Sequence, residues 1–166
     1  MIATLLAASA LAQPEARTAV YVELGGNALI YSLNVERRLG DTFAVSTGLG
    51  SAGLREPTTD SSFGWVLNPW RVHGLIGGRR HHLELALGVT WGLARGDLNQ
   101  PGRPTNFWVV NGTSAIGYRY QSDDGGPVVR VAFTPHFGGE RFAPLGAALQ
   151  PWAGVSVGCA WGKRGS

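Results

Sequence analysis

The residues of this chain that could do chemistry are a few charged side chains set within long apolar segments. Charged residues make up only 15% of the 166 positions. Acidic and basic groups that are kept from bulk water pair with one another. The charged residues that alternate with apolar ones, and that we therefore expect to form a Glu/Arg cluster, are Glu36, Arg38, Glu84, Arg119 and Arg130.

Histidines provide the next candidates, at positions 73, 81, 82 and 136. Adjacent residues of a strand point to opposite faces, so His81 and His82 are not expected to share a metal ion. They are better interpreted as part of a basic turn beside phosphates. His136, with Thr134 and Glu140 nearby, could belong to a lipid-modifying enzyme. Because no His-x-Ser or Gly-x-Ser-x-Gly pattern accompanies it, we expect no catalysis.

Arginines supply nearly all of the positive charge and lie scattered along the chain. Four of them occur in segments that connect the predicted strands, namely Arg55, Arg95, Arg103 and Arg141. Arginine binds phosphate in a bidentate manner, so these side chains could contact a phosphorylated glycolipid. The alternative is that they are ordinary solvated charges. The net charge of +3 is not gathered on one basic face, which argues against nucleic-acid binding.

The segment 81–93 shows what kind of element positions these groups. Its apolar residues recur at every second position, and charged, small or polar residues lie between them. The apolar members are Leu83, Leu85, Leu87, Val89, Trp91 and Leu93. This period of two predicts a strand with one apolar face. Its length exceeds that of most soluble strands and suits a tilted strand that crosses a bilayer in about 9–11 residues.

Seven further segments from Thr18 onward repeat this alternation and are separated by turn signals. The sequence therefore predicts an all-β fold, a single eight-stranded antiparallel up-and-down transmembrane β-barrel over residues 18–162. Residues 51–62 are expected to form a polar loop. The segment 63–76 is the least regular, because Trp65 and Leu67 fall on one parity while Val72 and Ile76 fall on the other. A β-bulge near Asn68 would reconcile them, but the sequence leaves this register open.

The apolar parity is expected to face lipid. The opposite parity consists mostly of small residues, and an eight-stranded barrel has little room inside. Trp108 and Tyr118 share the apolar face ten residues apart, which is about 25 Å along a tilted strand and matches the lipid-facing band. The Glu/Arg cluster would then lie inside at the periplasmic end, and Glu23 inside at the outer end. The cluster is expected to plug the barrel; an ion path or gate is the alternative.

The first residues differ from the rest in being apolar without alternation. Residues 1–12 (MIATLLAASALA) end in an Ala-x-Ala pattern, which predicts a signal peptide. A packed N-terminal segment is the alternative. The chain has no run of 18 apolar residues that would predict a transmembrane helix. Its single cysteine, Cys159, allows no intrachain disulfide.

Several short motifs carry a resemblance to a known group of proteins. They are the segments 21–27 (YVELGGN), 32–38 (SLNVERR), 83–85 (LEL), 117–121 (GYRYQ) and 151–156 (PWAGVS). They resemble small, uncharacterised bacterial outer-membrane β-barrel proteins, from about Ala19 to Trp161. The resemblance implies the barrel fold and the bacterial outer membrane, and it implies no particular activity.

These observations favour an outer-membrane β-barrel with a structural or surface-interaction role, no catalysis, and an interior plugged by Glu/Arg pairs. The alternatives are a soluble lipocalin-like carrier of an apolar ligand and a lipid-modifying barrel enzyme. The expected partners are outer-membrane lipid and, during biogenesis, the barrel-assembly machinery. We expect a monomer that binds no cofactor, metal ion or nucleic acid.

Overall fold

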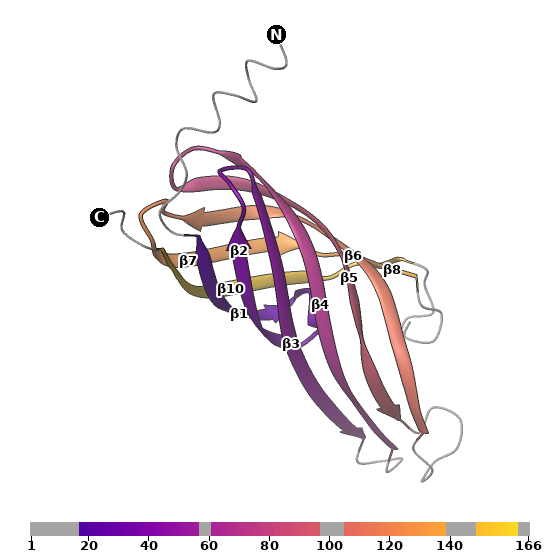
Figure 1. Cartoon of the computed structure of the whole chain (residues 1–166). Coiled ribbons are helices and arrows are strands. Elements are labelled where there is room, and N and C mark those ends of the chain that lie inside the picture. Colours follow the sequence, from indigo (N-terminus) through magenta and orange to yellow (C-terminus); the bar gives the residue numbers. More distant parts are fainter. Residues whose placement is uncertain (1–16, 57–60, 97–104, 139–148, 163–166) are drawn as a thin grey trace.

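The chain forms a closed antiparallel β-barrel in a computed structural model that describes residues 17–56, 61–96, 105–138 and 149–162 (Figure 1). The elements are β1 (Thr18–Gly25), the 3₁₀ turn η1 (Gly26–Ala28), β2 (Tyr31–Arg38), β3 (Phe43–Glu56), β4 (Ser61–Gly77), β5 (His81–Gly96), β6 (Thr105–Gln121), β7 (Gly126–Phe133), β8 (His136–Phe137), β9 (Leu149–Gln150) and β10 (Ala153–Trp161). Each long strand pairs with its neighbours in the sequence. The β1–β10 and β5–β6 ladders complete the ring.

Two barrel strands are interrupted by proline. β7 and β8 both pair with β6, and the break between them contains Pro135. β9 pairs with β8, and β10 pairs with β7. The break between β9 and β10 contains Pro151. Proline has no N–H to donate to a ladder, which explains the interruptions. With each pair taken as one strand, the described residues form the predicted eight-stranded antiparallel barrel.

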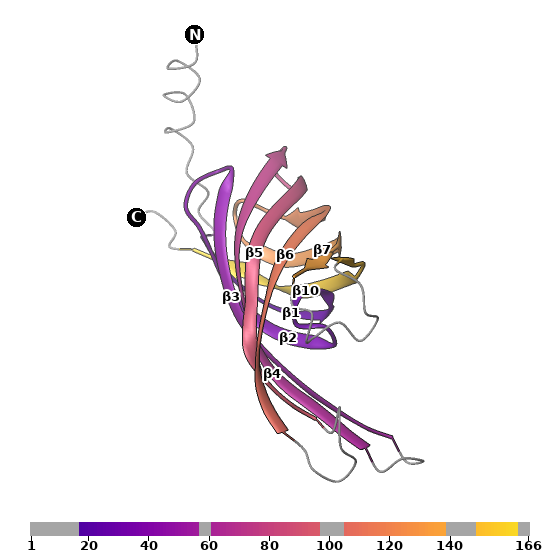
Figure 2. The ribbon, with the colours of Figure 1, turned by 90° about the vertical axis from the view of Figure 1, so that its right-hand side faces the viewer.

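The strands differ in length around the ring. β3, β4, β5 and β6 have 14, 17, 16 and 17 residues, whereas β1, β2 and β7 have 8 each and β10 has 9. The four long strands continue past the others at the end of the barrel away from the termini (Figure 2). The predicted polar loop 51–62 is therefore wrong in extent, because pairing continues as far as Glu56 and Ser61.

The burial pattern of β5 establishes which face of the sheet is apolar. Leu85 and Leu87 are 40% and 67% exposed, whereas Glu84 and Thr90 are 1% and 0% exposed. On the other strands, too, most large apolar side chains lie outside, and the buried charged side chains lie inside. This is the arrangement of a barrel whose outer surface faces hydrocarbon and whose polar residues face inward.

The β-bulge predicted in the segment 63–76 is absent. β4 pairs with β5 without interruption from Phe63 to Gly77, so its side chains keep one parity throughout. Trp65 and Leu67 point into the barrel, not toward its outer face. They face inward because the outer end of the interior is apolar.

That apolar outer end is built around the connection between β1 and β2. The buried side chains that meet there are Ala28, Leu29, Trp65, Leu67, Ala94 and Val109, with Phe63, Phe107 and Trp152 packed around them. η1 and Leu29 are folded into the barrel and are fully or almost fully buried. Leu29 adopts a positive φ of 74°, a strained backbone conformation for a residue that is not glycine. The connection thus covers the polar interior beneath it.

The described part of the chain has no helix long and apolar enough to cross a membrane. The predicted signal peptide, residues 1–12, lies outside the described residues.

Candidate functional site

Among the buried charged side chains of the described residues, three glutamates and three arginines form one group inside the barrel, which we call the interior network. They come from six different strands and are all 3% exposed or less: Glu23, Glu36, Glu84, Arg71, Arg119 and Arg130. Each lies on the inward parity of its strand, opposite the apolar outer face. Their formal charges cancel, as expected for ionised groups that are removed from water.

Two ion pairs form the centre of the network. Arg130 Nε donates to Glu84 Oε2 at 2.8 Å, and Arg130 Nη2 donates to Glu84 Oε1. Arg119 Nη1 donates to Glu36 Oε2 at 2.9 Å, and Arg119 Nη2 also contacts Glu36. Both guanidiniums therefore bind a carboxylate in the bidentate manner that gives the strongest such pairs. Arg119 Nη1 also lies 3.5 Å from Glu84 Oε2, which joins the two pairs into one unit.

His73 of β4 lies between the two carboxylates. Its Nδ1 is 2.8 Å from Glu84 Oε1, and its Nε2 is 2.8 Å from Ser46 Oγ. The order serine, histidine, carboxylate is that of a hydrolase triad. However, Ser46 and His73 are 4% and 0% exposed, and Glu84 is already engaged by two arginines. This arrangement fixes the histidine ring within the network.

A second group of contacts continues the network toward the outer end. Arg71 Nη1 lies 3.3 Å from Glu23 Oε1, and Arg71 Nη2 donates to Tyr21 Oη at 3.2 Å and to Asn34 Oδ1 at 3.3 Å. The Arg130 guanidinium stands 4.8 Å from the centre of the Tyr21 ring, a cation–π contact. Tyr21 therefore links the outer group to the central ion pairs.

Side chains from distant strands hold η1 above this outer group. Thr90 Oγ1 donates to the Asn27 carbonyl at 3.0 Å, and His136 Nε2 lies 3.1 Å from the Gly26 carbonyl. Trp65 Nε1 donates to the Ala28 carbonyl at 3.4 Å. The Thr90 bond gives the Asn27 carbonyl of this buried turn a partner, whereas the other two bonds add to those that the Gly26 and Ala28 carbonyls accept from the Leu29 and Ile30 N–H groups. They fix η1 as a cover over the network.

The structure brings four residues of the expected Glu/Arg cluster together, namely Glu36, Glu84, Arg119 and Arg130. Arg38 is buried but lies apart from them. Its Nη1 donates to Asp123 Oδ1 at 3.0 Å and its Nη2 to the Asp41 carbonyl at 3.0 Å. Glu23, which was expected at the outer end, pairs with Arg71.

Sequence reasoning missed Arg71 and assigned no role to His73. Both lie on β4, where Trp65 and Leu67 share their inward parity and made that parity look lipid-facing. The signal that identifies the outward parity is Trp70, which alternates with these two residues and is 54% exposed.

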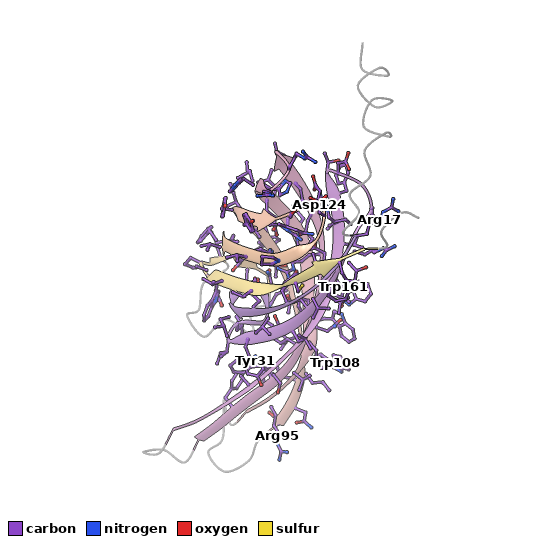
Figure 3. The ribbon with its side chains drawn as sticks, turned by 90° about the vertical axis from the view of Figure 1, so that its left-hand side faces the viewer. Arg17, Tyr31, Arg95, Trp108, Asp124 and Trp161 are labelled. Atoms are coloured by element: carbon purple, nitrogen blue, oxygen red, sulfur yellow. The ribbon has the colours of Figure 1, made fainter. Side chains whose placement is uncertain are left out.

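The remaining candidate residues lie at the two ends of the barrel. His81 is exposed and His82 is buried, as their opposite faces require, and no group of three or more metal-ligating side chains exists among the described residues. His136 and Thr134 are both buried, and His136 contacts η1. Arg95 is exposed at the far end of β5 (Figure 3). Glu140 and two of the four outer arginines, Arg103 and Arg141, lie outside the described residues, as does the side chain of Arg55.

Comparison with solved structures gives the class of the fold. The chain is similar to the N-terminal β-barrel domain of Pseudomonas aeruginosa OprF, with a TM-score of 0.64, 10% identity, and coverage of 90% of this chain and 98% of that one. It is also similar to Ail, the attachment invasion locus protein of Yersinia pestis, with a TM-score of 0.53, 12% identity, and coverage of 89% and 98%. No protein-family model and no curated protein matches the chain. At these identities the likeness concerns the fold, which is that of the eight-stranded barrels of bacterial outer membranes.

Proposed function

We propose that this chain spans the bacterial outer membrane as a closed barrel with a structural or surface-interaction role and no catalytic activity. The observation that carries the proposal is the inverted distribution of residues. Leucine, valine and tryptophan cover the outside, while a charge-balanced network fills the inside. In water such an outer surface would be a large aggregation-prone patch, whereas in a bilayer it is solvated by hydrocarbon. A soluble lipocalin-like carrier would need the reverse arrangement.

The contacts of the network support a closed interior. Ion pairs join strands on opposite sides of the barrel, such as β2 and β6, and η1 covers them at the outer end. Eight strands enclose only enough room for side chains. We therefore expect the barrel to act as a plugged scaffold and not as an ion path. Planar-bilayer recordings should show no channel conductance from the folded protein; stable unitary conductance would contradict the plug.

The absence of catalysis rests on the burial of Ser46. A serine hydrolase needs its nucleophile at a surface that substrate can reach, and Ser46 Oγ is enclosed with His73 inside the barrel. A fluorophosphonate probe should leave the folded protein unlabelled. Labelling that is lost in Ser46→Ala would overturn this part of the proposal.

The surface-interaction role is assigned to the long strands β3 to β6. They extend beyond the rest of the barrel at the end away from the termini, which is the outer end in the proposed orientation (Figures 1 and 2). Ail has been crystallised in complex with the heparin analogue sucrose octasulfate, a polyanion. Arg95 lies on this extension and Arg55 belongs to β3, whereas Arg103 and Arg141, also expected in outer loops, lie outside the described residues. We propose that these four arginines bind the phosphate groups of an outer-leaflet glycolipid.

Two experiments test the proposal at different levels. Expressed in a Gram-negative host, the protein should fractionate with the outer membrane and migrate differently on gels before and after heating, as folded barrels do. Recovery as a detergent-free periplasmic protein would favour the soluble carrier. Replacement of Arg55, Arg95, Arg103 and Arg141 by alanine should weaken glycolipid binding by the folded protein; unchanged binding would leave these residues as solvated charges.

A further inference from the structure

Two hollows adjoin at the end of the barrel that carries the termini. The first has a volume of about 400 Å³ and lies between the β4–β5 and β6–β7 turns. Its lining residues are Arg79, Arg80, His81, Ser122, Asp123 and Asp124. The second has a volume of about 380 Å³ and continues onto the outer face of β5 and β6. Its lining residues are His81, His82, Leu83, Gly117 and Tyr118. His81 belongs to both, so the two hollows form one continuous depression.

The first hollow presents both signs of charge. Arg79 and Arg80 are exposed and follow one another in the β4–β5 turn. Asp124, on the opposite side, is also exposed, and it stands at the terminal end of the barrel together with Arg17 (Figure 3). One carboxylate oxygen of Asp123 already has a partner, since Oδ1 accepts a hydrogen bond from Arg38. A ligand that matches this lining carries a phosphate and, a few ångströms away, a cation.

The second hollow is the surface that an acyl chain would follow. Leu83 and Tyr118 are each 47% exposed on the outer face of the barrel. His81 Nδ1 lies 2.7 Å from Tyr118 Oη, which places a polar group where the apolar surface begins. Aromatic and histidine side chains of this kind mark the level of lipid head groups in membrane barrels.

The depression is held in shape by bonds between its two walls. The Gln121 N–H donates to the Arg80 carbonyl at 2.9 Å, which ties the β6 end to the β4–β5 turn. Within that turn the Gly78 N–H donates to the His81 carbonyl at 3.1 Å. On the other wall, the Arg38–Asp123 pair anchors the β6–β7 turn to the barrel interior. A preformed site of this kind orders little on binding.

From this charge pattern and its continuity with an apolar groove, we propose that the depression binds one phosphatidylethanolamine molecule of the periplasmic leaflet. Arg79 and Arg80 hold the phosphate, Asp124 holds the ammonium group, and one acyl chain lies along Leu83 and Tyr118. Phosphatidylglycerol matches the arginines but offers no cation to Asp124. The inference rests on the proposed membrane location, since the lipid reaches the site only from a bilayer.

The test uses full-length protein folded into vesicles of equal parts phosphatidylethanolamine and phosphatidylglycerol. The protein is then released in mild detergent, and bound lipid is counted by native mass spectrometry. The wild-type protein should retain one phosphatidylethanolamine in preference to phosphatidylglycerol. Arg79→Gln combined with Arg80→Gln should lower its retention roughly thirtyfold, given the usual contribution of two interfacial cations. Asp124→Asn should shift the preference toward phosphatidylglycerol.

Arg37→Gln is the matched control. Arg37 is an exposed arginine near the same end of the barrel, where its Nη1 donates to Thr18 Oγ1, and it does not line the depression. It should leave the retained lipid unchanged. Equal retention of both lipids by the wild-type protein, or equal losses in the double variant and the control, would mean bulk lipid only and overturn the inference. Failure of the wild-type protein to fold into vesicles would instead contradict the proposed membrane location.

Discussion

Replacing Glu84 by glutamine tests the interior network at its most connected point. The change keeps the shape of the side chain and removes one negative charge from a balanced set. Glu84 accepts hydrogen bonds from Arg130, contacts His73 Nδ1 at 2.8 Å, and lies 3.5 Å from Arg119. The variant therefore leaves Arg130 buried without its carboxylate and the lumen with an excess positive charge.

The expected loss of stability follows from the burial of the Glu84–Arg130 ion pair. Breaking a buried ion pair by removing one partner lowers the free energy of unfolding by about 3–5 kcal/mol. Glu23→Gln provides a graded comparison, because Glu23 has one contact to Arg71 at 3.3 Å and its Oε2 has no hydrogen-bond partner among the described residues. Its loss should be smaller, about 1.5–3 kcal/mol, as for one hydrogen bond to a charged group.

The assay is urea unfolding in phospholipid vesicles, followed by tryptophan fluorescence and extrapolated linearly to water. Adding Arg130→Gln to Glu84→Gln restores the charge balance, so the double variant should lose less stability than the sum of the two single variants. An effect of Glu84→Gln below about 1 kcal/mol, or strict additivity in the double variant, would refute the claim that these residues form a coupled, water-free network.

Three further predictions concern the surroundings of the network. Gly88→Ala should lower stability by about 1–3 kcal/mol, because a Cβ there would lie 2.0 Å from the Trp70 carbonyl, whereas Gly78→Ala, with nothing within 4 Å, should be neutral in the same urea assay. Arg38→Gln should lower stability by about 1 kcal/mol or less, since its partner Asp123 has a side chain that is 33% exposed; a loss as large as that of Glu84→Gln would contradict this. The exposed Cys159 should react slowly with a water-soluble maleimide in vesicles and rapidly after unfolding, because it faces lipid; equal rates would place it in water.

The barrel itself could be predicted from the sequence because most strands obey one rule along their whole length. In β5 every outward position from Leu83 to Leu93 is apolar, and the positions between them are small, polar or charged. Alternation of this kind specifies both the element and its faces. The direction of the faces was also predictable, since a narrow lumen accepts charged side chains only if they pair.

β4 could not be interpreted in this way because the interior changes character along the barrel axis. It is polar around Arg71 and His73 but apolar around Trp65 and Leu67, beneath η1. An inward-facing strand that crosses this boundary therefore carries large apolar side chains at one end and charged ones at the other. If large apolar residues are assumed to mark the outer face, the two halves of β4 are assigned to opposite faces. This assumption predicts a β-bulge, but the β4–β5 ladder contains none.

The sequence also could not predict which glutamate of the network pairs with which arginine. Glu36 on β2 binds Arg119 on β6, and Glu84 on β5 binds Arg130 on β7. Neither pair of strands is adjacent in the sheet: the Glu36–Arg119 contact crosses the lumen, and the Glu84–Arg130 contact spans the inner face of β6. Strand patterns predict which residues face inward, whereas the pairing requires the three-dimensional register.

In the proposed membrane barrel, lipid surrounds the outer face while the inner face is closed to both lipid and water. Trp91 and Trp65 lie on the neighbouring strands β5 and β4 and point to opposite faces, with exposures of 42% and 6%. Two single-tryptophan proteins, each retaining one of them with the others replaced by phenylalanine, can be folded into vesicles containing brominated phosphatidylcholine. We predict strong quenching of Trp91 and weak quenching of Trp65, with neither reached by iodide. Equal quenching of the two by brominated lipid, or quenching of Trp91 by iodide in place of lipid, would contradict a lipid-facing outer surface around a closed interior.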